Sequence, residues 1–224
     1  MLGTGHATVT ECYNTCFALQ GDGAYADTFF LVDGGGGNTI LKQLKAAGVD
    51  WRRIRTIFVT HRHIDHLLGI IWLMRVICAA MSRGEYRETV TIYGHEELLS
   101  LIRDMSRELL QKKWIASIDK QLLLEPVHDG EGKVILGKTV TFFDILSKKE
   151  KQYGFCMKLD EKNKFTCLGD EPYRENELPY AKDSAWLLHE AFCLYAEADR
   201  FHPYEKHHSP VRDACEAAQT LCVK

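Results

Sequence analysis

The stretch FVTHRHIDHLLG, residues 58–69, packs three histidines and one aspartate into six positions between two apolar runs. Four polar side chains in such a setting cost free energy unless other groups satisfy them. In extended chain, His61 and His63 project to the same side of a strand. Asp65 and His66 then begin a helix, which turns them in a second direction. The spacing predicts two neighbouring sub-sites for divalent ions.

The chemistry of these four side chains indicates which ions they would bind. Imidazole and carboxylate ligands without a thiol suit Zn²⁺, with Mn²⁺ or Fe²⁺ as substitutes. The alternative, a solvated histidine cluster on the surface, fits poorly between two apolar runs. A zinc site is therefore predicted at the junction of a strand and a helix.

The composition is that of an ordinary globular protein, with 224 residues of which 46% are hydrophobic and 26% charged. No Pro/Ser-rich linker divides the sequence, so one domain over residues 1–224 is predicted. The formal net charge of −3 and the scattered basic residues lack the footprint of a general nucleic-acid binder.

The sequence gives no indication of a membrane or secretory protein. The longest apolar stretch, residues 67–80, contains Arg75 and is shorter than the ~20 residues needed to span a bilayer. Because no basic and apolar leader is seen at the N-terminus, the eight cysteines are expected to be reduced. A cytoplasmic protein without a membrane partner is predicted.

Apolar, β-branched runs alternate with amphipathic segments along the chain, which favours the α/β class with sheets covered by helices. Two similar halves are expected. Strands are predicted over residues 28–33, 55–60, 89–94, 121–127, 132–136, 138–146, 152–160, 164–170 and 184–192, and helices over 38–47, 67–83, 95–110 and 210–221.

Four consecutive glycines, residues 34–37, follow the first long apolar strand. They do not form a phosphate loop, because no GK[ST] follows and the GxGxxG spacing is missing. Glycine lacks a Cβ, so this turn is predicted to allow a close backbone approach beneath the site.

The motif THRHIDH (60–66) resembles the THxHxDH signature of the metallo-β-lactamase superfamily. Further short motifs resemble its ribonuclease Z-like branch, and together they run along most of the chain. They are LGTG (2–5), VDGGGG (32–37), LGDEP (168–172), LHEAF (188–192) and HHS (207–209).

This resemblance implies a four-layer αβ/βα sandwich, the metallo-β-lactamase fold, with two zinc ions at the sheet edges. Asp170 matches the carboxylate that bridges the ions, and His208 matches a ligand of the second ion. His189, with Glu190, matches the pair that handles protons at the leaving group. Asp65 would orient or deprotonate the attacking oxygen.

Simpler roles for these residues remain open. Asp170 could be a turn aspartate and His189 a core histidine satisfied by hydrogen bonds. His208 is preferred over His207 because Ser209 follows it, as in the motif.

The sequence departs from the family pattern in two places. The family supplies a further histidine to the first ion, but residues 143–155 contain none. Leu146, or a residue just after it, occupies the expected place, where water, substrate or Lys148 would fill the gap. The first ion is therefore expected to bind weakly. The insertion that grips tRNA is also missing, so tRNA is not the expected substrate.

These features together predict a metal-dependent hydrolase that uses a metal-activated hydroxide on a phosphodiester, of the cyclic nucleotide or short RNA class. One alternative is an acyl, lactone or thioester hydrolase of the same fold. Another is a catalytically weak protein that binds one ion. A homodimer is an expectation for this type of protein, although the sequence locates no interface.

Overall fold

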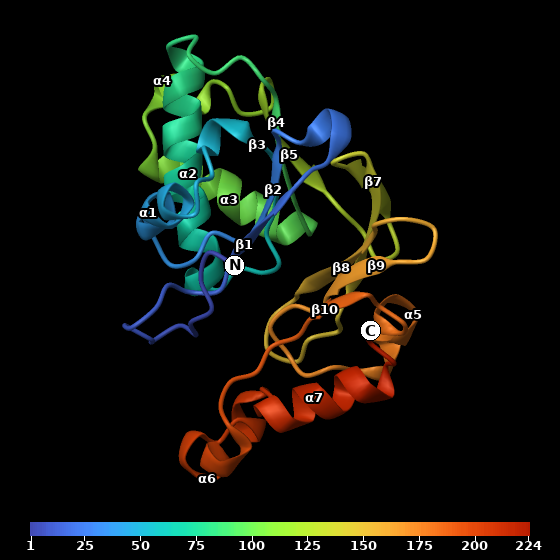
Figure 1. The fold of residues 1–224 in the computed structure, drawn as a ribbon. Helices are drawn as coiled ribbons and strands as arrows, with labels where there is room; N and C mark the ends of the chain where they lie inside the picture. Colours follow the sequence, from blue (N-terminus) through green and yellow to red (C-terminus); the bar gives the residue numbers. More distant parts are fainter. The chain divides into compact units, whose positions relative to one another are not determined.

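The computed structural model describes all 224 residues, which form two compact units, Met1–Val127 and His128–Lys224 (Figure 1). Each unit contains one five-stranded sheet with helices. This arrangement confirms the predicted α/β class. The prediction of a single domain over residues 1–224, and of a four-layer stack, stays a prediction.

The first unit has a largely parallel sheet in the order β1-β2-β3-β4-β5, in which only β1 runs antiparallel to its neighbour. Its helices α1, α2 and α3 gather on one face of the sheet (Figure 1). The bounds are β1 Phe17–Gln20, β2 Phe29–Val32, α1 Thr39–Ala46, β3 Ile54–Phe58, α2 Ile64–Ser82, β4 Val90–Gly94, α3 Glu96–Leu109, α4 Lys112–Ile115 and β5 Leu122–Pro126.

Strand β2 and the apolar residues of β3 are buried, and apolar side chains of both strands pack with α2 in a single core. Because β2 and β3 are parallel and Val32 pairs with Phe58, the residues that follow them emerge at the same edge of the sheet. Helix α2 is long and apolar enough to cross a bilayer, but 67% of its apolar window is buried inside the protein. This degree of burial is typical of a helix in a protein core.

The glycine turn after β2 makes the close backbone approach that the sequence predicts. The Gly34 amide donates to the carbonyl of His66 at 2.8 Å, and the Gly69 amide donates to the carbonyl of Gly35 at 2.8 Å. A Cβ on Gly69 would lie 1.8 Å from the Gly34 oxygen. The turn and the helix α2 can therefore approach this closely only because the residues at the contact have no side chain.

Replacing Gly69 with alanine is expected to lower the free energy of unfolding by about 3 kcal/mol, because backbone must move to admit the methyl group. Urea denaturation would measure this loss. Gly37→Ala is the matched control, since a Cβ at Gly37 meets nothing within 4 Å. Equal stability of the two variants would contradict the proposed close contact between Gly69 and the glycine turn.

The second unit has a mainly antiparallel sheet in the order β10-β9-β8-β7-β6, with β10 parallel to β9. Phe143, Leu168 and Leu221 belong to a core cluster that joins this sheet to its helices. The bounds are β6 Gly132–Ile135, β7 Lys138–Asp144, β8 Tyr153–Lys158, β9 Lys164–Cys167, α5 Leu178–Ala181, β10 Trp186–Leu188, α6 Ala198–Phe201 and α7 Val211–Thr220.

One predicted strand differs from the structure. The segment 184–192 was expected to form a buried strand, but β10 has only three residues and lies at the edge of its sheet. Trp186 is 68% exposed. Because β10 is a terminal strand that pairs only with β9, one of its edges has no neighbouring strand, and the apolar run WLL is not a sign of full burial here.

Candidate metal centre

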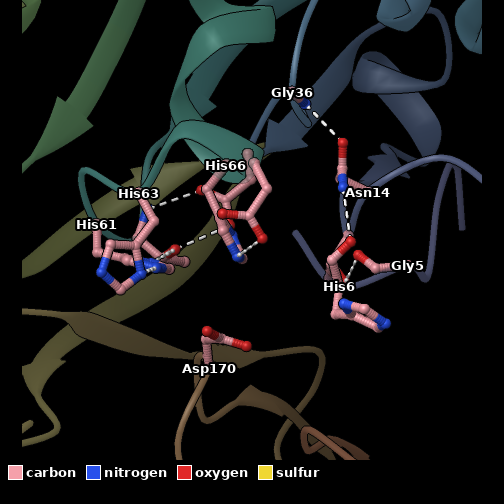
Figure 2. Close-up of polar contacts among 12 residues, drawn as sticks. Gly5, His6, Asn14, Gly36, His61, His63, His66 and Asp170 are labelled. Carbon is pink, nitrogen blue, oxygen red and sulfur yellow. Dashed lines mark hydrogen bonds and ion pairs between the residues drawn. The ribbon is translucent and has the colours of Figure 1, made fainter. Parts of the chain in front are cut away.

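Three histidines of the first unit point toward one another at the junction of β3 and α2 (Figure 2). Nε2 of His61 lies 2.9 Å from Nδ1 of His63. The ring centroid of His61 is 4.2 Å from that of His66. His61 and His66 are both buried. The structure therefore brings together the three imidazoles that the motif predicts.

Asp65 completes the set of four predicted residues in this unit. It lies in the first turn of α2, where a carboxylate is favoured by the helix dipole. Its Oδ2 is 3.6 Å from Nε2 of His66. This distance leaves the two groups near each other without a direct hydrogen bond.

Asp33 is a residue of this cluster that sequence reasoning placed only at the end of a strand. Its buried carboxylate accepts hydrogen bonds from the amide and the hydroxyl of Thr60, both at 2.8 Å. Its Oδ2 also lies 2.8 Å from Nδ1 of His66. The available signal was its position at the end of a strand parallel to the one that enters the histidine motif.

A carboxylate on Nδ1 of a histidine fixes the tautomer in which Nε2 carries the lone pair. Asp33 therefore favours the tautomer of His66 in which Nδ1 carries the proton and Nε2 carries the lone pair. Because φ at Asp33 is +57°, in the left-handed region that Asp and Asn tolerate best, the backbone also favours this residue type.

The glycine turn beside the cluster is held in place from the N-terminal segment (Figure 2). Oδ1 of Asn14 accepts from the Gly36 amide at 3.1 Å, and its Nδ2 donates to the carbonyl of His6 at 2.9 Å. The hydroxyl of Tyr13 lies 2.8 Å from the carbonyl oxygens of Gly34 and Gly37. Burial raises the pKa of Tyr13 to about 12, so it remains a neutral phenol.

The second unit carries its own histidine–carboxylate pair. Nδ1 of His208 lies 3.2 Å from Oε2 of Glu190, and Oε1 of Glu190 accepts from the Ser209 amide at 2.5 Å. The His208 ring also stacks on Phe192 with centroids 4.9 Å apart. Glu190 thus positions His208, as Asp33 positions His66 in the other unit.

Asp170 lies in the same part of the second unit as His208. It follows β9 through Gly169, and its amide donates to Oε1 of the buried Gln152 at 3.3 Å. Nζ of Lys149 is 3.3 Å from the Asp170 carbonyl and 3.2 Å from Nε2 of His208. One lysine therefore links the two predicted ligands of this unit.

Lys149, rather than Lys148, contacts the predicted ligands where the family has a further histidine. Its loop is fixed by the buried carboxylate of Glu171, which accepts from Ser147 Oγ and from Arg174, each at 2.5 Å. Sequence reasoning missed this role of Glu171, because buried pairing in a loop leaves no periodic pattern. An ammonium group is a hydrogen-bond donor, so Lys149 does not replace the missing ligand while it is charged.

Both ring nitrogens of His189 contact backbone groups. Nε2 accepts from the Tyr173 amide at 3.1 Å, and Nδ1 lies 2.5 Å from the Glu190 carbonyl. These contacts require the tautomer that carries its proton on Nδ1. In this conformation His189 connects two loops of the second unit.

The buried carboxyl group of Glu177, near these loops, is expected to make the stability of the protein depend on pH. It is almost fully buried, and burial raises the pKa of its carboxyl to about 8. The folded state then holds a proton that the unfolded state releases near its ordinary pKa of 4.5. The stability contributed by this group is complete below pH 4.5 and is lost as the pH rises to about 8.

Glu177→Gln is expected to remove this dependence. Between pH 5 and 8 the variant should lose less unfolding free energy than the wild type, by about 3 kcal/mol. Urea denaturation across that range measures it. Glu175→Gln, at an exposed position two residues earlier, is the control. If both variants keep the wild-type pH profile, Glu177 is not the titrating group.

Comparisons with known proteins place the chain among relatives of the kind that its motifs suggest. Residues 1–206 match the family described as anti-Pycsar protein Apyc1. A ribonuclease Z from Pyrococcus abyssi is 25% identical in an alignment that covers 96% of this chain and 80% of that protein. The resemblance to the ribonuclease Z-like branch is thereby confirmed.

Two solved structures share the fold. The short form of human tRNase Z is 23% identical, with a TM-score of 0.72 over 99% of this chain and 86% of that chain. The metallo-β-lactamase fold protein YhfI from Bacillus subtilis is 18% identical, with a TM-score of 0.66 over 84% of this chain and 69% of that chain. These likenesses confirm the predicted metallo-β-lactamase fold, and the match over residues 1–206 shows that the chain belongs to the anti-Pycsar protein Apyc1 family.

Proposed function

We propose that this chain is a metal-dependent hydrolase of phosphodiester bonds, acting on a small substrate of the cyclic nucleotide or short RNA class. The observation that carries the proposal is the pair of carboxylate-held histidines, His66 with Asp33 and His208 with Glu190. Each has its Nδ1 on a buried carboxylate, which puts the lone pair on Nε2. At His208, Nε2 would have to release Nζ of Lys149 before it could bind an ion. The name of the relative ribonuclease Z describes an enzyme that cleaves RNA, which supports a phosphodiester as the substrate.

The residues present fit two divalent ions. In the proposed assignment His61 and His63 would hold the first ion, Asp65, His66 and His208 would hold the second, and Asp170 would be a further ligand. Neutral imidazoles and carboxylates are suitable ligands for Zn²⁺, and Mn²⁺ or Fe²⁺ could take the same positions. The first ion is expected to bind more weakly, because residues 143–155 supply no histidine.

When bound, such ions polarise the phosphodiester and lower the pKa of water to about 7. The protein's own groups then complete the reaction. Asp65, whose Oδ2 lies near Nε2 of His66, would orient the attacking water and accept its proton. His189 would stabilise or protonate the departing oxygen, for which its Nε2 must release the Tyr173 amide.

Hydrolysis assays on four substrates test this proposal: a cyclic mononucleotide, a short RNA, a precursor tRNA and an aryl ester. We expect zinc- or manganese-dependent turnover of at least one of the first two, abolished by EDTA. Faster hydrolysis of the aryl ester would instead indicate an acyl hydrolase. One tightly bound zinc per chain and no turnover would indicate a binding protein.

Three finer properties belong to the same proposal. We infer that precursor tRNA is a poor substrate, because one helix, α3, and the short α4 stand between β4 and β5 where a gripping arm would be needed. We also infer a cytoplasmic protein and a homodimer, which fractionation of cells and sedimentation of the purified chain would test.

A further inference from the structure

A pocket of about 360 Å³ lies within the second unit, beside His208. Pockets for small-molecule ligands occupy about 300–1,000 Å³, so this one suits a single nucleotide better than a polymer. Three segments that are distant in sequence line it: the loop that carries Lys148, the turn after β9, and the segment before α7. The lining residues are Lys148, Pro172, Tyr173, Arg174, Tyr204, His207 and His208.

The charges of this pocket favour an anion, because its lining contains basic side chains and no carboxylate. Arg174 is already engaged by the buried Glu171, and His208 is engaged by Glu190. Lys148 is exposed and forms no hydrogen bond or ion pair in the structure. It is the cation of the pocket that remains available to a ligand, and an ammonium group is a common phosphate-binding group.

Two tyrosines give the same pocket an aromatic lining. The hydroxyl of Tyr204 donates to Oδ2 of Asp213 at 2.9 Å, which anchors the tip of the ring. The backbone amide of Tyr173 is held by His189. Aromatic side chains stack on nucleobases with little preference for sequence, so an anchored ring and an available lysine in the lining of one pocket suit a nucleotide.

We propose that this pocket binds the nucleoside monophosphate part of the substrate, with Lys148 on a phosphate oxygen and Tyr204 against the base. The inference rests on the proposed function, because it takes the scissile phosphodiester to lie at the neighbouring His208. It assigns Lys148 and Tyr204 to substrate binding rather than to the chemical step.

The test measures binding by isothermal titration calorimetry, with adenosine 5′-monophosphate, ribose 5-phosphate and adenosine as probes. Lys148→Met is expected to lower the affinity for the two phosphorylated probes about 10-fold and to leave the affinity for adenosine unchanged. Tyr204→Ala is expected to lower the affinity for the two probes that carry the base about 10-fold and to leave the affinity for ribose 5-phosphate unchanged. Tyr204→Phe, which keeps the ring, is expected to retain both affinities.

Lys182→Met is the matched control, because Lys182 is exposed in the same unit and does not line the pocket. The pocket assignment is overturned if Lys148→Met and Lys182→Met bind all probes alike, or if the wild-type chain does not bind adenosine 5′-monophosphate. Binding does not require turnover. If the chain binds the phosphorylated probes through Lys148 but hydrolyses no phosphodiester, the proposed function is therefore wrong and the assignment of the pocket still holds.

Discussion

Replacing Asp170 with alanine is expected to lower the rate of phosphodiester hydrolysis by about 10²–10⁴-fold, because bound metal ions contribute several kcal/mol to transition-state stabilisation. The same variant is expected to bind fewer divalent ions per chain. Steady-state kinetics and native mass spectrometry measure the two effects.

The backbone at Asp170 is expected to keep its contacts in this variant. The backbone of Asp170 is fixed by its own amide, which donates to Gln152, and by its carbonyl, which accepts from Lys149. Neither contact involves the carboxylate that is removed. An unchanged melting temperature would therefore separate loss of the metal centre from loss of structure.

Asp199→Ala is the control for charge, since Asp199 is exposed on α6 of the same unit. His66→Ala, in the other unit, is expected to give the same losses as Asp170→Ala. If both residues serve one centre, the double variant will be little worse than either single variant. Full activity and full metal content in Asp170→Ala would refute the assignment.

Much of the fold could be predicted from the sequence, because the elements that matter have strong local patterns. Strand β2 is a continuous apolar run, β3 is rich in apolar and β-branched residues, and the start of α2 follows directly from the histidine motif. The edge strand β10 could not be distinguished from a buried one, since both read as a short apolar run.

The site was predictable only where the contributing residues are neighbours in sequence. His61, His63 and His66 lie within six positions, so their convergence follows from local geometry. Asp33 and Glu190 act on histidines that are 33 and 18 positions away. Such pairings depend on strand order and loop paths, which single-sequence patterns do not encode.

The two carboxylates that hold histidines provide the second large prediction. Asp33→Asn and Glu190→Gln are each expected to weaken zinc binding by about 10–100-fold, because a carboxylate hydrogen-bonded to Nδ1 orients the ring and raises the basicity of Nε2. At Asp33, donors from Thr60 and His66 meet two carboxylate oxygens. Asparagine offers only one acceptor oxygen, so one donor must face an amide NH₂ group.

The same reasoning applies to Glu190 in the other unit. Glutamine can still accept from the Ser209 amide, but its NH₂ group then faces Nδ1 of His208. This arrangement favours the tautomer with the proton on Nε2, which has no lone pair left for a metal. Competition with a chromophoric chelator would measure the zinc affinity of each variant.

These two variants also test whether the units share a centre. If His66 and His208 bind the same ion, Asp33→Asn and Glu190→Gln will weaken the same step of the zinc titration. Glu108→Gln and Glu161→Gln, at exposed positions of the first and second unit, control for the lost charge. If the two variants weaken different steps, His66 and His208 bind separate ions. If both variants keep the wild-type affinity, Asp33 and Glu190 do not contribute to zinc binding.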